Sequence, residues 1–400
     1  MSYWYRKVRA FHALPVVLLG AAQAQAADVQ VAGLAEAFTE WNTNRAMEVG
    51  DVDNSMGYAV EAGALFKIAT PLSTTTLRPL LGYVTYPDQD DDSVTGVLDL
   101  ASVYSGQRSQ FALYGRFDFR DTFSSELAPP GFNDVAPDLP TTPETGRVST
   151  NGTRTLVTAV PSYQFAVTQR ADFHLSATLQ MADYNGDSSD AYVSYTYYSG
   201  ETGFGWKPSP LSRLSLSAFA GKSQNKDDDG EAEAVGAALE YIRDTSEKFT
   251  SKLRLTVEQD DVTVVVPTTV HDKSTNWGAD YTLYWKGQIS EVDFNVGRTF
   301  TPGGNGGLSQ AGQVQLELRR KLSPRTQLNW VARYIRYEGL VDVAGSDYDY
   351  LNTGLGLTWD LTRTWYVSSG VQYWREEFDN GADPDNVQVN LAFGYRGLQR

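Results

Sequence analysis

The sequence predicts an all-β protein, a single antiparallel up-and-down transmembrane β-barrel. Three observations predict it: runs of about ten residues alternate in polarity, tight turns alternate with long acidic loops, and tryptophans lie beside both kinds of connection. The clearest tight turn is Leu322-Ser323-Pro324-Arg325, between alternating runs at 313–319 and 326–330. Successive side chains of a strand point to opposite faces, so a barrel wall alternates between lipid and interior, as this pattern does.

The first residues predict a secretory signal peptide. Three basic residues within the first nine precede an apolar run at 10–22, and Ala24-Gln25-Ala26 supplies small residues for cleavage. The apolar run is too short to cross a bilayer as a helix, and a retained N-terminal anchor is the alternative. We therefore expect residues 1–26 to be removed and residues 27–400 to form the barrel domain, in the cell outer membrane.

Composition excludes several kinds of chemistry and partner. The chain has no cysteine, which excludes disulfides, thiolate metal sites, c-type haem attachment and cysteine nucleophiles. It has 33 basic and 49 acidic residues, a net charge of −16; without Arg6, Lys7 and Arg9 the balance is 30 − 49 = −19. Such acidity argues against nucleic acid or anionic lipid as an electrostatic partner. No cofactor is expected.

Four predicted strands, at 111–120, 249–258, 277–286 and 387–396, can be sorted by face. A basic residue buried in lipid costs about 2–4 kcal/mol at the bilayer centre, which fixes the register of these strands. The side chains expected to face lipid are Phe111, Leu113, Phe117, Phe119, Phe249, Leu253, Leu255, Val257, Trp277, Ala279, Tyr281, Leu283, Trp285, Val389, Leu391, Phe393 and Tyr395.

The connections predict the strand number. Tight turns are expected at 71–73, 105–107, 169–170, 208–210, 245–247, 286–287, 323–324 and 362–363. Long acidic loops are expected near 42–54, 87–92, 125–152, 184–190, 224–230, 259–272, 302–307, 339–347 and 376–385. Nine outer loops imply about 18 strands, within a range of about 16–18, with short periplasmic turns and long extracellular loops.

Prolines and tryptophans add local expectations. Pro79 and Pro161 fall inside predicted strands, where a missing N–H indicates a bulge or a strand end. Tryptophans sorted between the two rims are typical of interfacial girdles, which a soluble β-sandwich or β-solenoid has no reason to form. The expected girdle residues are Trp206, Trp285, Trp359 and Trp365 beside short turns, and Trp41, Trp277 and Trp374 near long loops.

A barrel of this size encloses a lumen too wide for its own side chains to fill. The charged side chains expected to line it are Arg116, Asp118, Arg120, Lys252, Arg254, Asp280, Asp293, Glu317, Arg319 and Arg333. The third long loop resembles the inward-folded third loop of general porins in position and length. We expect it to form a constriction through Glu126, Asp134, Asp138 and Glu144, facing basic wall residues; a mobile surface loop is the alternative.

The mixed charge and the many inward amides and hydroxyls indicate a wall suited to small hydrophilic solutes, including sugars. A porin-like channel or export pore is the first hypothesis, and a non-conducting outer-membrane scaffold is the second. An enzyme is not expected, because His174 shares a face with Ser176 but no third catalytic member accompanies them. The acidic clusters at 90–92, 227–229 and 379–385 could bind divalent cations that bridge lipopolysaccharide, but none has EF-hand spacing.

Short motifs carry a resemblance to a known family. They are Thr74-Thr75-Thr76-Leu77-Arg78-Pro79, the segment 83–87, Gln107-Arg108 with residues 121–127, and the turn at 322–326. These segments resemble the β-barrel porin family associated with exosortase and exopolysaccharide gene clusters (β-barrel porin 2 type). The resemblance implies an outer-membrane barrel acting in surface polysaccharide export, with no catalytic residues to carry over. The partners expected are outer-membrane lipid, lipopolysaccharide and the barrel assembly machinery.

Overall fold

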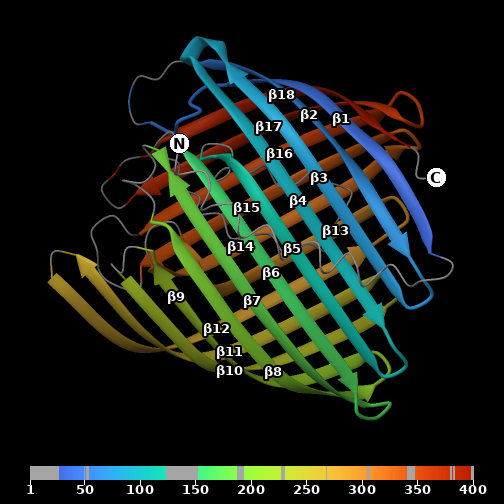
Figure 1. Ribbon diagram of the computed structural model, residues 1–400, viewed down its shortest axis with the longest axis vertical. Coiled ribbons are helices and arrows are strands. Elements are labelled where there is room, and N and C mark those ends of the chain that lie inside the picture. Colours follow the sequence, from blue (N-terminus) through green and yellow to red (C-terminus); the bar gives the residue numbers. More distant parts are fainter. Residues whose placement is uncertain are drawn as a thin grey trace, which may run out of the picture.

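Eighteen antiparallel strands form a closed β-barrel in the computed structural model (Figure 1). Each strand pairs with its neighbours in sequence, and β1 also pairs with β18, so the sheet has no free edge. Closure gives every strand a hydrogen-bonded partner on each side, as a lipid environment requires, although the ladder between β12 and β13 runs only from Asp280↔Gly297 to Lys286↔Glu291. The predicted fold class and a count of 18 are confirmed.

The strands contain 12 to 19 residues, more than the roughly 9–11 that cross a hydrocarbon core. Their bounds are β1 (Asp28–Asn42), β2 (Ser55–Ala69), β3 (Ser73–Tyr86), β4 (Asp91–Ser105), β5 (Ser109–Asp121), β6 (Thr153–Ala166), β7 (Ala171–Asn185), β8 (Tyr195–Ser209), β9 (Ser212–Asn225), β10 (Gly230–Ser246), β11 (Phe249–Val266), β12 (Thr268–Lys286), β13 (Ser290–Gly303), β14 (Gly307–Ser323), β15 (Thr326–Gly339), β16 (Tyr348–Asp360), β17 (Trp365–Phe378) and β18 (Asp385–Arg396). One 3₁₀ turn, η3 (Pro87–Gln89), joins β3 to β4.

The structure describes residues 27–48, 50, 54–122, 152–186, 193–226, 230–266, 268–303, 307–339, 347–378, 381 and 383–397. The expected signal peptide and most of the third long loop lie outside these residues. Among the described residues, no helix has the length and apolar character needed to cross a membrane.

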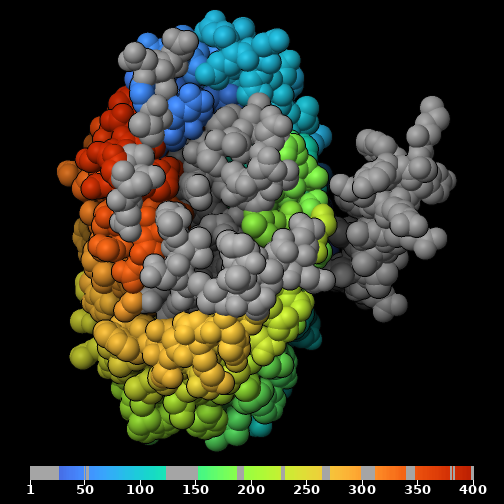
Figure 2. Space-filling model, turned by 90° about the vertical axis from the view of Figure 1, so that its left-hand side faces the viewer, coloured from blue at the N-terminus to red at the C-terminus, as the bar shows by residue number. Residues whose placement is uncertain are grey.

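The eight tight turns all fall where the sequence predicts them, and they leave two to four residues between paired strands. At the turn between β14 and β15, Arg325 N donates to Ser323 Oγ at 3.1 Å, and Ser323 Oγ donates to Thr326 Oγ1 at 3.0 Å. These short side-chain bonds stabilise a two-residue connection and set the register of the hairpin. The turns share one rim, and Figure 2 looks onto the opposite rim, where the strands follow one another in sequence order.

One expected loop is wrong. Residues 259–272 are strand rather than loop, because β11 continues to Val266 and β12 begins at Thr268. The pairing runs to Val266↔Thr268, so only residue 267 separates the two strands. The β-branched residues of this segment favour extended pairing, and they override the turn signal of its aspartates. The resulting hairpin extends past its neighbours at the left of Figure 1.

The two prolines interrupt pairing on one side only. Pro79 keeps its partner Leu98 in β4, whereas the ladder to β2 lapses between Gly63↔Leu80 and Phe66↔Leu77. A Cβ on Gly63 would lie 2.2 Å from the Pro79 carbonyl oxygen, so the close approach requires glycine there. Pro161 likewise pairs with Leu113 of β5, and the ladder to β7 lapses beside it. The missing N–H therefore interrupts one ladder without ending either strand.

Apolar side chains project from one face of the wall in the predicted alternation. Leu81, Leu216, Leu255 and Val389 have exposed fractions between 45% and 70%, whereas their neighbours in sequence on the other face are largely covered. Trp41, Trp206, Trp277, Trp285, Trp359 and Trp365 are also exposed. Trp374 is the exception: it is 2% exposed and belongs to a buried cluster, so its place in the outer girdle is wrong. Trp374 is an even number of residues from buried Gln372 and Glu376 in β17, so all three lie on the same face, opposite to the exposed one.

Candidate functional site: the inner wall of the barrel

Side-chain contacts that skip strands identify the inner face. Arg213 of β9 binds Asp172 of β7 across β8, and Arg254 of β11 binds Glu201 of β8 across two strands. Adjacent strands are about 4.8 Å apart, so such pairs meet only where side chains converge, on the concave side of a curved sheet. The polar face is therefore the inner wall.

A row of alternating charges crosses β3, β4 and β5. Arg78 forms a two-point contact with Asp99, with Nε donating to Oδ2 at 3.0 Å. Asp99 faces Arg116 in the register, 3.9 Å from Nη1 to Oδ1, and Arg116 Nη2 donates to Asp118 at 2.7 Å. Arg120 completes the row with Nε 3.0 Å from the second oxygen of Asp118. We call these five residues the charge ladder; three cations and two carboxylates leave it one positive charge in excess.

A second group of ion pairs covers β7 to β11. Arg213 binds both oxygens of Asp172, at 2.6 and 3.2 Å, and Arg254 binds both oxygens of Glu201, at 2.8 and 3.1 Å. Glu240 lies 2.9 Å from Lys252 and 3.7 Å from Arg213, which connects the pairs. Bidentate arginine–carboxylate pairs hold both side chains in a fixed plane, so this part of the wall is ordered by its own charges.

The wall formed by β12 to β15 uses amides in place of most arginines. Asp280 accepts from Asn295 Nδ2 at 2.8 Å and from Thr282 Oγ1 at 3.3 Å. Asn295 in turn accepts from Gln313 at 3.0 Å. Carboxylates held by neutral donors keep their charge uncompensated, so this side of the interior is more negative than the charge ladder.

The remaining predicted residues lie on the same wall of β12 to β15, which we call the amide strip. Gln315 accepts from Arg333 Nε at 3.2 Å and donates to Glu317 at 2.7 Å. Glu317 lies 3.7 Å from Arg319 and faces Asp293 across β13 and β14. The amide strip therefore contains two facing carboxylates, and one arginine and one amide contact Glu317.

The first outer connection folds over the inner wall. Asn44 N and Thr43 Oγ1 both donate to Asn386 Oδ1, at 2.9 and 3.2 Å. Arg45 lies 3.5 Å above the ring of Tyr86 and donates to Asp91 at 2.5 Å. We call residues 43–48 the first loop. It is fixed to β18 at one point and to the strands around the charge ladder at another.

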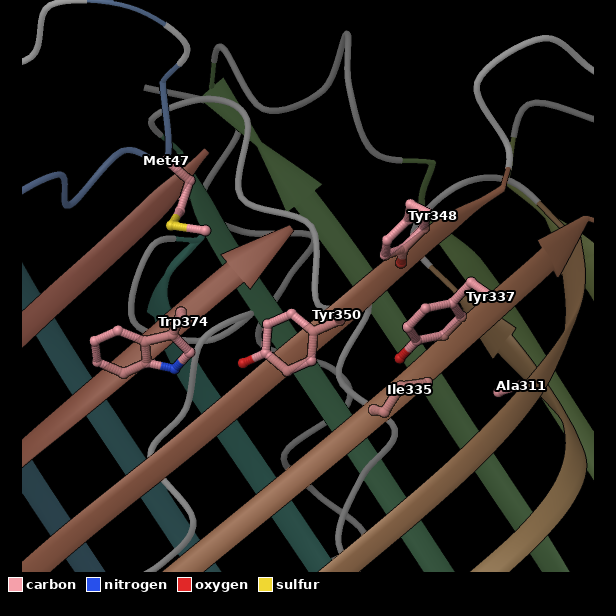
Figure 3. Close-up of a cluster of buried hydrophobic side chains, with 7 residues drawn as sticks. All are labelled: Met47, Ala311, Ile335, Tyr337, Tyr348, Tyr350 and Trp374. Carbon is pink, nitrogen blue, oxygen red and sulfur yellow. The ribbon is translucent and has the colours of Figure 1, made fainter. Parts of the chain in front are cut away.

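Aromatic and amide side chains cover the wall of β16 and β17. Asn352 lies directly opposite Trp374, and Gln372 lies opposite Gly354. Tyr350 belongs to the same buried cluster as Trp374 and Met47, the latter contributed by the first loop (Figure 3). We call Tyr350, Asn352, Gln372 and Trp374 the amide–aromatic patch.

All ten predicted wall residues lie among the contacts above. The structure brings Arg116, Asp118 and Arg120 together in one row, Lys252 and Arg254 in the second group, and Asp280, Asp293, Glu317, Arg319 and Arg333 in the amide strip. The four residues of the expected constriction, Glu126, Asp134, Asp138 and Glu144, lie outside the described residues.

Sequence reasoning missed several members of these groups. Alternation along β3 places Arg78 on the inner face, although Pro79 beside it indicates a strand break. Arg45 and Met47 lie in a connection, where no periodicity predicts which side chain turns inward. The position of Trp374 near a long loop predicts the lipid interface, whereas its register in β17 predicts the inner face.

The structure places His174, the histidine expected on the inner face, within an ion-pair group. His174 lies between Arg213 and Glu201, 3.5 Å from the guanidinium nitrogen and 3.9 Å from the carboxylate oxygen, so it belongs to the ion-pair group. Within the residues that the structure describes, no group of three or more His, Cys, Asp or Glu side chains is placed to hold a metal ion.

Comparison with known proteins gives structural neighbours only. No family model matches this sequence, and no curated protein matches it. The chain is similar to OccK2 (OpdF) of Pseudomonas aeruginosa, solved in complex with glucuronate, with a TM-score of 0.47 and 10% identity over 93% of this chain and 99% of that one. It is also similar to OccK5 (OpdH) of Pseudomonas aeruginosa, with a TM-score of 0.46 and 12% identity over the same shares.

A third neighbour is OccAB3 of Acinetobacter baumannii, with a TM-score of 0.44 and 8% identity over 92% of this chain and 99% of that one. The assignment of a closed 18-strand barrel comes from the hydrogen-bonded ladder of this chain itself. The resemblance to the exosortase-associated family stays a prediction.

Proposed function

We propose that this protein is an outer-membrane channel, either for small hydrophilic solutes or for export of a surface polysaccharide. The observation that carries the proposal is the division of the wall into an apolar outer face and an inner face of paired charges and amides. A soluble barrel would place polar side chains outside and apolar ones inside. An interior of fixed polar groups suits hydrated solutes.

The third long loop and the location in the outer membrane are part of the same proposal. Secretion through a signal peptide at 1–26 and insertion by the barrel assembly machinery would bring the chain to a bilayer containing lipopolysaccharide. The loop at 125–152 would narrow the lumen by turning Glu126, Asp134, Asp138 and Glu144 toward the basic wall residues. Several of those residues already bind wall carboxylates, since Arg116 and Arg120 pair with Asp118, so the loop would meet a nearly balanced surface.

Planar-bilayer recording of the refolded full-length chain tests the channel. We expect discrete conductance steps, and a variant lacking residues 130–146 should give larger ones because it removes the narrowing segment. Equal conductance with and without that segment contradicts the constriction. No steps from a folded, inserted wild-type barrel contradicts the channel.

A structural scaffold is the second candidate, and the first loop favours it. Met47 is 4% exposed and Arg45 is 6% exposed, so this connection covers part of the inner wall rather than the outside. A barrel closed in this way would hold a partner at its rim and conduct nothing. The same recording separates the two candidates, because a scaffold gives no steps in any variant.

A further inference from the structure

The amide–aromatic patch holds buried polar atoms without partners. Trp374 Nε1, Asn352 Nδ2 and both polar atoms of the Gln372 amide make no hydrogen bond within the part of the chain that the structure describes. The exposed fractions of these residues are 2%, 3% and 1%. Three donor atoms and one acceptor atom on two adjacent strands therefore have no hydrogen-bond partner among the described residues.

Such an arrangement is unfavourable unless something binds to it. An unsatisfied buried donor or acceptor destabilises the folded protein, and apolar side chains at such positions would remove that cost. The neighbouring strand β15 shows that apolar residues are compatible with this wall, since Val331 and Ile335 are buried there. The unpartnered amides and indole N–H are thus expected to serve a ligand rather than the fold.

The chemistry of the patch indicates an uncharged ligand rich in hydroxyl groups. Indole and phenol rings offer flat apolar faces with one polar edge, and primary amides both donate and accept. A carboxylate, Glu376, follows Trp374 on the same face and would repel an anion. Arg333 lies opposite Asn352 and keeps its positive charge, because its Nε donates to the neutral amide of Gln315. One charge of each sign therefore borders the patch, which favours neither an anion nor a cation. A saccharide ring has the required apolar face and peripheral hydroxyls.

Met47 packs with the aromatic side chains of the patch in the present conformation. Its side chain packs in the same cluster as Trp374 and Tyr350, from a loop rather than from the wall (Figure 3). Its backbone φ is 52°, a left-handed conformation that non-glycine residues rarely adopt. Release of this conformation when the residue moves out would favour exchange of Met47 for a ligand.

We propose that the amide–aromatic patch is a binding site for a neutral saccharide, which replaces Met47 against Trp374 and bonds to Asn352 and Gln372. The inference rests on the proposed channel, because a solute reaches the inner wall through an open barrel. It adds a substrate class and a defined position on β16 and β17.

Isothermal titration of the detergent-solubilised full chain with maltose, cellobiose and lactose tests the site. We expect at least one disaccharide to bind, and Trp374→Phe to weaken it about fivefold through loss of the N–H donor. Gln372→Leu removes two polar atoms and should weaken binding about tenfold or more. Met47→Ala should strengthen it. Trp359→Phe is the matched control, because Trp359 is 53% exposed on the outer face and should have no effect.

Three results overturn the inference: no disaccharide binds, Trp374→Phe and Gln372→Leu bind as tightly as the wild type, or galacturonate binds more tightly than the neutral sugars. Bilayer recording separates this failure from failure of the channel. A conducting barrel that binds no saccharide contradicts the site alone, and a non-conducting barrel that binds one in a Gln372-dependent manner contradicts the channel alone.

Discussion

The charge ladder on β3–β5 and the amide–aromatic patch on β16–β17 are both buried polar surfaces of one barrel, but they satisfy their polar groups differently. Each guanidinium of the ladder lies within 3.9 Å of a carboxylate. In the patch, Asn352, Gln372 and Trp374 have polar atoms without partners in the described chain. Two ladder oxygens, Asp99 Oδ1 and Asp118 Oδ1, also lack a hydrogen bond, but each faces a guanidinium at 3.9 and 3.0 Å. The ladder therefore balances its buried charges with one another, whereas the neutral groups of the patch have no such counterpart and are available to a ligand.

The first loop connects the two regions. Arg45 binds Asp91 and Tyr86 beside the ladder, and two residues later Met47 packs against the patch. Asn44 is held to Asn386, which lies opposite Trp374 in the register. A change on the ladder side can therefore alter how well the patch is covered.

The largest expected effect is loss of stability at the ladder. Asp99→Leu leaves the buried Arg78 without its carboxylate, and removing one member of such a pair costs about 3–5 kcal/mol. The double variant Arg78→Met with Asp99→Leu should regain most of that loss, because both charges are gone. Urea unfolding of the inserted barrel, followed by tryptophan fluorescence, measures both.

The control for this prediction is Arg298→Ala. Arg298 pairs with Glu338 at 3.2 Å, but both side chains are about two-fifths exposed, at 41% and 42%. We expect a change within about 1 kcal/mol. If Asp99→Leu is as mild as this control, the ladder does not stabilise the wall.

A smaller effect is expected where the two regions are joined. Arg45→Ala removes the contact to Asp91 and the cation–π contact with Tyr86, together worth about 1–3 kcal/mol. The first loop should then leave the inner wall more often and expose Met47. Oxidation of Met47 by hydrogen peroxide, read by peptide mass spectrometry, should become faster in Arg45→Ala than in the wild type. An unchanged rate would show that the contacts to Asn386 hold the loop by themselves.

The smallest expected effect has the opposite sign. Gln372→Leu replaces two unpartnered polar atoms with an apolar group of similar size, so we expect the free energy of unfolding to rise by about 1 kcal/mol. A ladder substitution is expected to lower the free energy of unfolding and this patch substitution to raise it, so the two regions should differ in the sign of the effect. Destabilisation by Gln372→Leu of the size expected for Asp99→Leu would mean that the patch is a structural network like the ladder.

The sequence by itself determined the barrel and the position of every tight turn, and it predicted about 18 strands within a range of about 16–18. Strict alternation carries this information, because one residue of slip would exchange the lipid and interior faces of a strand. The same rule placed Arg116, Asp118, Lys252 and Arg254 on the polar face of their strands without knowledge of their partners. It did not predict that residues 259–272 pair as strand, where local turn signals and β-branched pairing conflict.

Only the tertiary structure decided which inward side chains meet. Arg254 and Glu201 are 53 residues apart in the chain and lie on strands separated by two others, so no local pattern relates them. The sequence predicts Trp374 at the lipid interface because it lies near a long loop. Proximity to a loop does not determine which face of a strand a side chain occupies. The curvature of the closed sheet brings inner side chains within contact across several strands, and the first loop adds Arg45 and Met47 to two different parts of that surface. Convergence of this kind is a property of the closed barrel and is absent from any single strand.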